Sequence, residues 1–397
     1  MACRAFRTFR VYRPFPIVRI LVLNYEHPPL GGGGGRLAAK VASGLVRRGH
    51  QVRIVTAGMP HLPLESVEEG IEVRRLRAFR RREDTCSVPE MAAWVMRAIP
   101  AAIAEVHRWK PDVIHAHFAV PTGAVAWAVH KVTGVPYVLT AHLGDVPGGV
   151  PEQTGNMFRW IKPFTVPIWR DAAATTAVSS FVAGLANEAY GVRPKIILNG
   201  IELPATPELK QSEIPRLLMV GRMSVQKNPL AAVSALALLK DLPWTMSVIG
   251  DGPLLAGMRA ETERLGLASR IEFRGWATAA EVSAEMGNSS ILVMPSLSEG
   301  LPMVAVEALT HGLAIVGSRI GGLADVACEP DESKAGGNAR LYDLAEGVGG
   351  LAAAMKPFLL NPQILMSARR ASLEKASAFD LNHALDDYEA VLKQATR

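Results

Sequence analysis

The chain has 397 residues, of which 49% are hydrophobic and 20% are charged, and its formal net charge is +6. This length is too great for one ordinary core and predicts two domains, while the composition excludes an intrinsically disordered chain. The three cysteines (Cys3, Cys86 and Cys328) form no close pair in the sequence. We therefore expect neither a disulfide framework nor a zinc site, and a reducing cytoplasm as the compartment.

Membrane insertion and secretion are not expected. No stretch approaches the roughly 18 to 20 consecutive apolar residues that a spanning helix requires. Residues 1–19 carry five Arg and no acidic residue, but they contain neither a continuous apolar core nor a small-residue cleavage site.

Positive charge is concentrated in the first half of the chain. Residues 1–190 carry 23 Lys and Arg against 14 Asp and Glu, whereas the rest carries 20 against 23. One cluster contains Arg74, Arg75, Arg77, Arg80, Arg81 and Arg82, and we call it the Arg74–Arg82 segment. It is either a solvated basic face or a contact with an anionic partner, which is anionic lipid at the inner membrane surface or a phosphorylated acceptor. Nucleic acid is not expected as a partner, because the segment lacks the alternating aromatic side chains of a stacking platform.

Short β-branched segments alternate with longer amphipathic segments, which is typical of parallel sheets covered by helices. In the first half we expect strands at 18–24, 51–57, 71–76, 112–117, 136–142 and 174–179. Helices are expected between them, including 36–49 and 91–109, the second of which contains Pro100 and is open to a bend there.

A second series of strands is expected at 216–221, 244–250, 270–275, 291–296 and 313–318. The polar, Pro-containing segment 198–215 separates the two series and is typical of a linker. The sequence thus predicts an α/β fold with two doubly wound, Rossmann-like domains, at 1–200 and 201–375. Residues 376–397 follow as an amphipathic C-terminal helix whose packing partner the pattern leaves open.

Ligands of open parallel sheets bind beyond the carboxyl ends of the strands, so motifs at these ends are candidates for a site. The glycine run Gly31–Gly35 follows the first strand, where it indicates either close approach of a ligand to the main chain or a flexible loop. It does not fit a dinucleotide-binding fingerprint, because Arg36 and Leu37 occupy positions that require glycine, and it is not a Walker loop.

Charged side chains follow a strand in each half. Arg222 and Lys227 come just after the first strand of the second series, where they favour either a diphosphate clamp or a pair of surface cations. His142 and Asp145 lie at the end of a strand of the first series, in a polar turn that either hydrogen-bonds a substrate, orients a proton-transfer group or is structural. Gly250 marks a sharp turn after another strand. His115 and His117 lack a third ligand in the sequence, so we expect no metal.

The segment 295–309 (PSLSEGLPMVAVEAL) places Glu299 in a turn and Glu307 in a helix that should be buried. Burying an ionised carboxylate in apolar surroundings without a partner costs roughly 3 kcal/mol or more of stability. The segment therefore predicts a ligand or a partner residue for Glu307.

These motifs together resemble one enzyme family. The ordered set GGGGGR, HAHF, TAHLGD, ILNGIE, VGRMSVQKNP, VIGDGP, FRGW and SEGLPMVAVEAL resembles the retaining nucleotide-sugar glycosyltransferases of family 4, over about residues 17–390. The resemblance implies a GT-B fold, with two domains facing a cleft and the terminal helix crossing back onto the first domain. Two mild departures are Glu202 and Asp325, where the family often has Asp and Glu.

The resemblance also implies roles for particular residues. Glu299 is expected to contact donor-sugar hydroxyls and Glu307 the nucleotide ribose. Arg222 and Lys227 are expected to bind the diphosphate and stabilise the leaving nucleotide, with His142 near the reacting centre. The remaining donor-binding candidates are Gly34, Gly35, Asp145, Gly250, Gly300, Leu301 and Met303.

The expected activity is metal-independent, retaining transfer of a hexose or N-acetylhexosamine. The donor is a nucleotide-diphosphate sugar, with UDP favoured over GDP, and no cofactor is expected. The acceptor is a hydroxyl group, for which a lipid-linked saccharide is favoured and a soluble acceptor is the alternative. The rival functions are a nucleotide-sugar epimerase and a catalytically silent nucleotide-sugar-binding protein.

Overall fold

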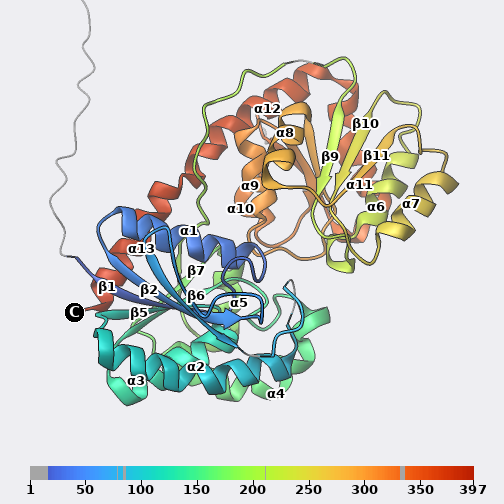
Figure 1. The fold of residues 1–397 in the computed structure, drawn as a ribbon. Helices are drawn as coiled ribbons and strands as arrows, with labels where there is room; N and C mark the ends of the chain where they lie inside the picture. The colour runs from blue at the N-terminus through green and yellow to red at the C-terminus, as the bar shows by residue number, and fades with distance from the viewer. Residues whose placement is uncertain (1–16, 78, 84–85, 211, 331–335) are drawn as a thin grey trace, which may run out of the picture.

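Two α/β domains make up the protein (Figure 1). The structure, a computed structural model, describes residues 17–77, 79–83, 86–210, 212–330 and 336–397. The Arg-rich opening segment, including Cys3, lies outside the described residues.

The first domain is built on a sheet with the strand order β3-β4-β2-β1-β5-β6-β7-β8. Its strands are β1 (Arg19–Asn24), β2 (Gln51–Gly58), β3 (Glu65–Glu68), β4 (Ile71–Arg77), β5 (Val113–His117), β6 (Tyr137–Ala141), β7 (Ala174–Ala177) and β8 (Lys195–Ile196). Neighbouring strands run parallel, except that the edge strand β3 is antiparallel to β4. The central strands β5 and β6 are buried along their whole length, as expected for a sheet covered on both faces.

Helices cover both faces of this sheet, with α1 on one side and α2, α3 and α4 on the other (Figure 1). The first-domain helices are α1 (Gly33–Arg47), α2 (Val88–Trp109), α3 (Ala124–Thr133), α4 (Pro151–Arg170) and α5 (Ser180–Tyr190). A short π-helical turn, η1 (Ala119–Gly123), precedes α3. The helix expected at 91–109 begins earlier, at Val88, because Ser87 and Glu90 form a capping box at its start.

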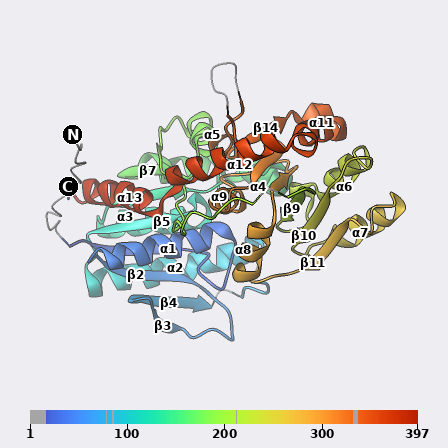
Figure 2. The ribbon, with the colours of Figure 1, turned by 90° about the horizontal axis from the view of Figure 1, so that it is seen from above.

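The second domain contains a parallel sheet with the order β11-β10-β9-β12-β13-β14. Its strands are β9 (Arg216–Val220), β10 (Thr245–Ile249), β11 (Ile271–Gly275), β12 (Ile291–Met294), β13 (Ala314–Ser318) and β14 (Ala339–Tyr342). The helices are α6 (Pro229–Ala237), α7 (Leu255–Arg264), α8 (Ala279–Asn288), α9 (Met303–Thr310), α10 (Leu323–Val326), α11 (Gly347–Leu360) and α12 (Pro362–Ala376). Figure 2 shows this domain beside the first one from above.

Each strand expected from the sequence is present, with its ends within two residues of the expected ones. The α/β fold with two parallel sheets is therefore confirmed. Three strands were not expected: β3, β8 and β14. The expectation of purely parallel sheets is wrong for the first domain, because β3 is antiparallel to β4.

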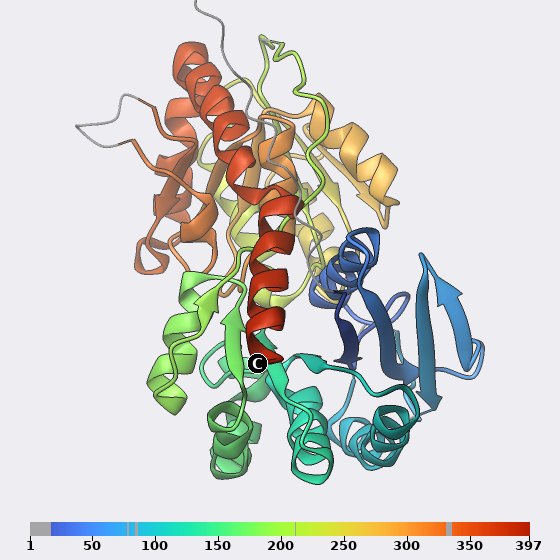
Figure 3. The same cartoon turned by 90° about the vertical axis from the view of Figure 1, so that its left-hand side faces the viewer.

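The end of the chain returns to the first domain (Figure 3). After α12 and the short turn Ser377–Phe379, helix α13 (Leu381–Ala395) packs on α1, β5 and β6. Ion pairs hold it there, with Arg48 Nη1 at 2.7 Å from Asp386 Oδ1 and Lys195 Nζ at 2.6 Å from Asp387 Oδ1. The packing partner that the sequence pattern left open is thus the first domain.

Candidate functional site between the two domains

The loops at the strand ends of the two domains approach each other closely. A Cβ atom on Gly33 would lie 4.0 Å from Met303 Cγ, across the gap between the domains. A Cβ on Gly300 would lie 2.5 Å from the main-chain oxygen of His142. The glycine run and the His142 loop of the first domain therefore meet the segment 299–303 of the second.

The glycine run forms the start of α1. Gly32 is the N-cap, and Gly34 and Gly35 lie in the first turn. A Cβ on Gly34 would lie 2.8 Å from Phe118 Cζ and 3.0 Å from His142 Nδ1. At Gly35, a Cβ would lie 2.5 Å from the main-chain oxygen of Glu26. In this structure, protein groups lie close to the main chain of Gly34 and Gly35. Gly34 lies next to the His142 ring.

His142 is held in a defined position at the end of β6. Its ring is 7% exposed and stacks on Phe118, with centroids 4.2 Å apart and an interplanar angle of 28°. Burial lowers the pKa of His142 to about 4, although the Asp145 carboxylate opposes this shift. The imidazole is therefore neutral at pH 7.

Asp145 supports the loop that carries His142. Its Oδ1 accepts hydrogen bonds from the main-chain N–H groups of His142 (2.9 Å) and Leu143 (2.8 Å). Its Oδ2 accepts one from the N–H of Ala119 (2.7 Å), and the side chain is buried. We expected a donor contact for Asp145. In this structure its carboxylate joins the loop that carries His142 to the turn that begins at Ala119, and the donor contact stays a prediction.

His117 and Phe118, which sequence reasoning did not select, also shape the site. His117 Nδ1 lies 3.2 Å from His142 Nε2, so one of these nitrogens donates to the other. Burial holds the pKa of His117 well below its usual value, and that of His115 falls to about 3. The sequence could have indicated His117 and Phe118 as site residues, because they lie at the carboxyl end of β5, in the same motif as His115.

Lys227 and Glu299 form an ion pair in the second domain. Lys227 Nζ lies 2.5 Å from Glu299 Oε1, and Glu299 is 6% exposed although it lies in a turn. The loops that carry them are joined by a hydrogen bond from Gln226 Nε2 to the main-chain oxygen of Ser298 (3.0 Å). Arg222 is exposed at the end of β9, on the same loop as Lys227. Of the two predicted cations, Lys227 therefore lies beside the predicted sugar-contacting carboxylate.

Glu307 differs from the expectation of a buried carboxylate, because it is only half-buried on α9. Burial still raises its pKa, while its neighbours Lys40, Arg36 and His311 act in the opposite direction. Among the described residues, no hydrogen bond to its carboxylate is present. Lys40 and Arg36 belong to α1, so the carboxylate faces the first domain.

The other second-domain candidates are explained by close packing or by the helix start. A Cβ on Gly250, which has a φ of +128°, would lie 1.9 Å from the main-chain oxygen of Gly221, so glycine is required to bring the two strand-end loops together. Leu301 is buried, and α9 begins at Met303 with Pro302 as N-cap. The first-turn N–H groups of α9 thus lie at the gap between the domains.

The Arg74–Arg82 segment, for which the sequence left open a solvated face or an anionic partner, is only partly exposed. Arg75 and Arg80 are buried, and Arg75 Nη2 lies 2.5 Å from Glu68 Oε1. Arg80 donates to the main-chain oxygens of Arg82 and Glu83, both at 2.9 Å. Arg77, Arg81 and Arg82 are exposed.

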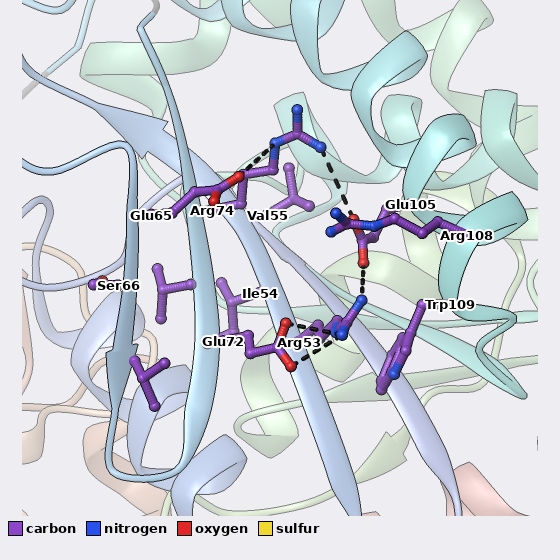
Figure 4. A pocket seen from close by; sticks show the side chains of 12 residues that line it. Arg53, Ile54, Val55, Glu65, Ser66, Glu72, Arg74, Glu105, Arg108 and Trp109 are labelled. Atoms are coloured by element: carbon purple, nitrogen blue, oxygen red, sulfur yellow. Dashed lines mark hydrogen bonds and ion pairs between the residues drawn. The ribbon is translucent and has the colours of Figure 1, made fainter.

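Arg74 contributes instead to a cavity of about 540 Å³ between β2, β3, β4 and α2 (Figure 4). The buried Glu105 is one of its lining residues and lies 2.6 Å from Arg53 Nη1, 2.7 Å from Arg108 Nη2 and 3.9 Å from Arg74 Nη1. These ion pairs connect α2 to β2 and β4. The cavity is therefore a structural feature of the sheet edge, away from the loops around His142.

Within residues 17–397, as far as they are described, no three His, Cys, Asp or Glu side chains are grouped so as to hold a metal ion. None of the described helices is both long and apolar enough to span a bilayer.

Comparison with known proteins identifies the family. The model of glycosyltransferase family 4 matches residues 31–204, and that of the group 1 glycosyl transferases matches residues 214–359. This chain is a family 4 glycosyltransferase. The resemblance found in the sequence motifs is confirmed.

Curated relatives of this glycosyltransferase match it over most of their length. The 2-deoxystreptamine glucosyltransferase of Streptomyces kanamyceticus is 28% identical over 387 residues, covering 89% of this chain and 97% of that protein. A glycogen synthase of Mycobacterium tuberculosis is 26% identical over 389 residues, covering 91% of each.

Solved structures show that the family 4 glycosyltransferase has the GT-B fold. Sucrose-phosphate synthase from Thermosynechococcus elongatus superposes with a TM-score of 0.79 at 18% identity, covering 95% of this chain and 98% of that one. Anabaena HepE in complex with UDP and glucose superposes with a TM-score of 0.71 at 18% identity, covering 95% and 99%.

Proposed function

We propose that this glycosyltransferase transfers a hexose or N-acetylhexosamine from a nucleotide-diphosphate sugar to a hydroxyl acceptor, with retention of configuration and without a metal. The observation that carries the proposal is the meeting of two sets of groups between the domains. Lys227, Glu299 and Glu307 come from the second domain, and the neutral His142 comes from the first.

Each group suits one part of such a donor. The cations Arg222 and Lys227 match a diphosphate, whose negative charge grows as the glycosidic bond breaks. Glu299 accepts hydrogen bonds from sugar hydroxyls and exchanges its partner Lys227 for the ligand as the diphosphate binds. Glu307, whose carboxylate has no hydrogen bond among the described residues, accepts from the ribose hydroxyls.

A front-face reaction fits these groups better than a covalent intermediate. In the proposed donor complex the Glu299 carboxylate accepts hydrogen bonds from sugar hydroxyls, and that of Asp145 is bonded to main-chain N–H groups. Neither is therefore free to act as a nucleophile. In the reaction we propose, an oxocarbenium-like state forms and the departing phosphate takes the acceptor proton.

UDP is the favoured nucleotide and GDP the alternative. The solved complex of Anabaena HepE with UDP and glucose supports UDP at the level of the shared fold. For the acceptor we favour a lipid-linked saccharide or polysaccharide precursor, because the first half of the chain is basic. A soluble acceptor such as the one in the name of the 2-deoxystreptamine glucosyltransferase is the alternative.

The rival functions differ in their products. A nucleotide-sugar epimerase would act on the donor without forming a glycosylated acceptor. A silent binding protein would bind the nucleotide without turnover. The pairing of Lys227 with Glu299, together with a neutral His142, favours an active glycosyltransferase over the epimerase and over the binding protein.

Calorimetric titration with UDP and GDP, with and without EDTA, tests the donor site first. We expect micromolar binding of one nucleotide that EDTA does not change and that Glu307→Ala abolishes. Transfer by Glu299→Ala, Arg222→Ala and Lys227→Ala should then fall at least about 100-fold, as for groups that stabilise a transition state. Glu263→Ala, an exposed carboxylate on α7, is the matched control. Wild-type turnover in all three site variants would contradict the assignment.

A further inference from the structure

Helices α1 and α9 face each other across the gap between the domains. A Cβ atom on Gly33, the first residue of α1, would lie 4.0 Å from Cγ of Met303, the first residue of α9. Residues three, four or seven positions apart lie on one face of a helix. The face of α1 that begins at Gly33 therefore continues through Arg36 and Lys40. The face of α9 that begins at Met303 continues through Glu307.

The carboxylate of Glu307 is thus opposite two cations of the other domain. Burial raises its pKa, and Lys40, Arg36 and His311 oppose this shift, in that order. His311 follows α9 directly, as its C-cap. Helices α10 and α12 also pack on α9, but among the described residues they add no charge that acts on this carboxylate. The cations of α1 are therefore the main groups that favour its ionised form.

Arg36 and Lys40 are not held by other carboxylates. Both are exposed, and within the described ranges neither side chain forms an ion pair or a hydrogen bond. Further along the chain, by contrast, Arg47 is paired with Glu202 at 3.4 Å and Arg48 with Asp386 at 2.7 Å. The charges of Arg36 and Lys40 therefore act on the gap between the domains.

The charge of Glu307 matters for the role proposed above. An ionised carboxylate accepts hydrogen bonds at both oxygens, whereas a protonated one turns one oxygen into a donor. We propose that Arg36 and Lys40 act across the gap to keep Glu307 in the ionised form that binds the ribose. They are positioning residues that act through Glu307. The inference rests on the proposed function, in which Glu307 accepts from the ribose hydroxyls.

This arrangement makes nucleotide binding depend on both domains. The two cations belong to the first domain and the carboxylate to the second, so their attraction weakens when the gap widens. A nucleotide that binds the ionised carboxylate binds best when the gap is narrow. Nucleotide binding therefore favours close contact between the domains.

The pH dependence of UDP binding tests the inference. In calorimetric titrations between about pH 5 and pH 8, the affinity should be constant at high pH and fall as Glu307 takes up a proton. Arg36→Gln with Lys40→Gln should move this fall upward by about one pH unit, because the pKa of Glu307 rises when the cations are removed. At the acidic end, this shift is about a tenfold loss of affinity. The phosphate of UDP titrates equally with every variant and leaves the comparison unaffected.

Two controls separate this effect from a general change of charge. Arg159→Gln with Lys162→Gln also removes one Arg and one Lys, both exposed on α4, and should leave the pH profile unchanged. Arg36→Lys with Lys40→Arg keeps both positive charges and should retain the wild-type profile. A shift in the α4 variant as large as that in Arg36→Gln with Lys40→Gln would overturn the inference.

A second measurement needs no nucleotide. In urea unfolding at about pH 8, Glu307→Gln should cost more stability in the wild type than in Arg36→Gln with Lys40→Gln, because only the wild type loses an attraction. Strictly additive effects would overturn the inference, whatever the result with UDP. So would a loss of UDP affinity that is equal at every pH, which would assign the cations to direct contact with the nucleotide. Coupled unfolding without any UDP binding by the wild type would contradict the donor site and leave the interaction across the gap in place.

Discussion

Asp325 in the second domain accepts a hydrogen bond from the first domain, with its Oδ2 2.9 Å from the main-chain nitrogen of Ser180. Ser180 is the first residue of α5, so the carboxylate meets the positive end of that helix. The loop before Asp325 also supports the donor segment, because the N–H of Gly322 donates to the main-chain oxygen of Glu299 at 3.0 Å. One loop thus connects the contact between the two domains with the position of Glu299.

Asp325→Ala should therefore weaken the contact between the two domains. We expect kcat/KM for the donor to fall about five- to tenfold, the size of one partly exposed charge-assisted hydrogen bond, whereas Asp325→Glu should retain most of the activity. Steady-state kinetics measure this change. Thr278→Ala removes a helix cap within the second domain and is the control. Equal kinetic losses in both Ala variants would show a general stability effect.

The Lys227–Glu299 pair predicts a stability effect without substrate. Lys227→Met leaves a nearly buried carboxylate without its partner, which should lower the free energy of unfolding by about 1–3 kcal/mol. Adding Glu299→Gln should restore part of this loss. Urea unfolding of the double-mutant cycle measures the coupling. Strictly additive effects would mean that the two side chains are not paired in solution.

Gly34→Ala should disturb the His142 ring. The new methyl group would lie 2.8 Å from Phe118 Cζ and 3.0 Å from His142 Nδ1, so the stacked rings must move. We expect a stability loss of about 1–3 kcal/mol and a larger drop in kcat than in donor affinity. Gly32→Ala, where nothing lies within 4 Å of the new Cβ, is the matched control. If both variants had the same kcat, the assigned contact of Gly34 would be wrong.

Buried histidines predict how stability depends on pH. His115 has an ordinary pKa of 6.5 when unfolded and about 3 when folded, so below pH 6.5 the unfolded state binds the extra proton. The contribution of His115 to stability is therefore fully present above pH 6.5 and is lost as the pH falls toward 3. His115→Gln should reduce the slope of unfolding free energy between pH 5 and 6 by about 1 kcal/mol per pH unit.

Urea unfolding at several pH values measures that slope. Thr140→Val removes the hydroxyl 2.8 Å from His115 Nε2 without removing a titratable group. It should lower stability at every pH and leave the slope unchanged. A wild-type slope in His115→Gln would mean that His115 is protonated in the folded protein.

The strands were predictable because most of them are continuous apolar segments between turns, as in ILVM of β12. The missed strands lack this signal. β3 has the sequence ESVE and pairs only at the sheet edge, and β8 contains only Lys195 and Ile196. Their formation depends on a neighbouring strand, which a local pattern does not show.

Candidate residues at strand ends were predictable as a group, but their individual environments were not. The sequence suggested that Glu307 is the buried carboxylate, whereas Glu299 is the more buried one, because its turn is covered by the loops of Lys227 and Gly322. Likewise, clustering of Arg residues in the sequence did not show that Arg75 points inward to Glu68. Such pairings join distant segments and depend on the tertiary structure.

Because α13 packs on the first domain, this domain can complete its folding only late in translation. Tyr388 is fully buried in that domain, and its ring lies 5.4 Å from His115 on the central strand β5. A ribosome completes every strand of the first sheet, and then the whole second domain, before it makes this residue. Until α13 has been synthesised, the core of the first domain lacks the side chain of Tyr388. The native packing of this domain is therefore completed only when α13 has emerged from the ribosome.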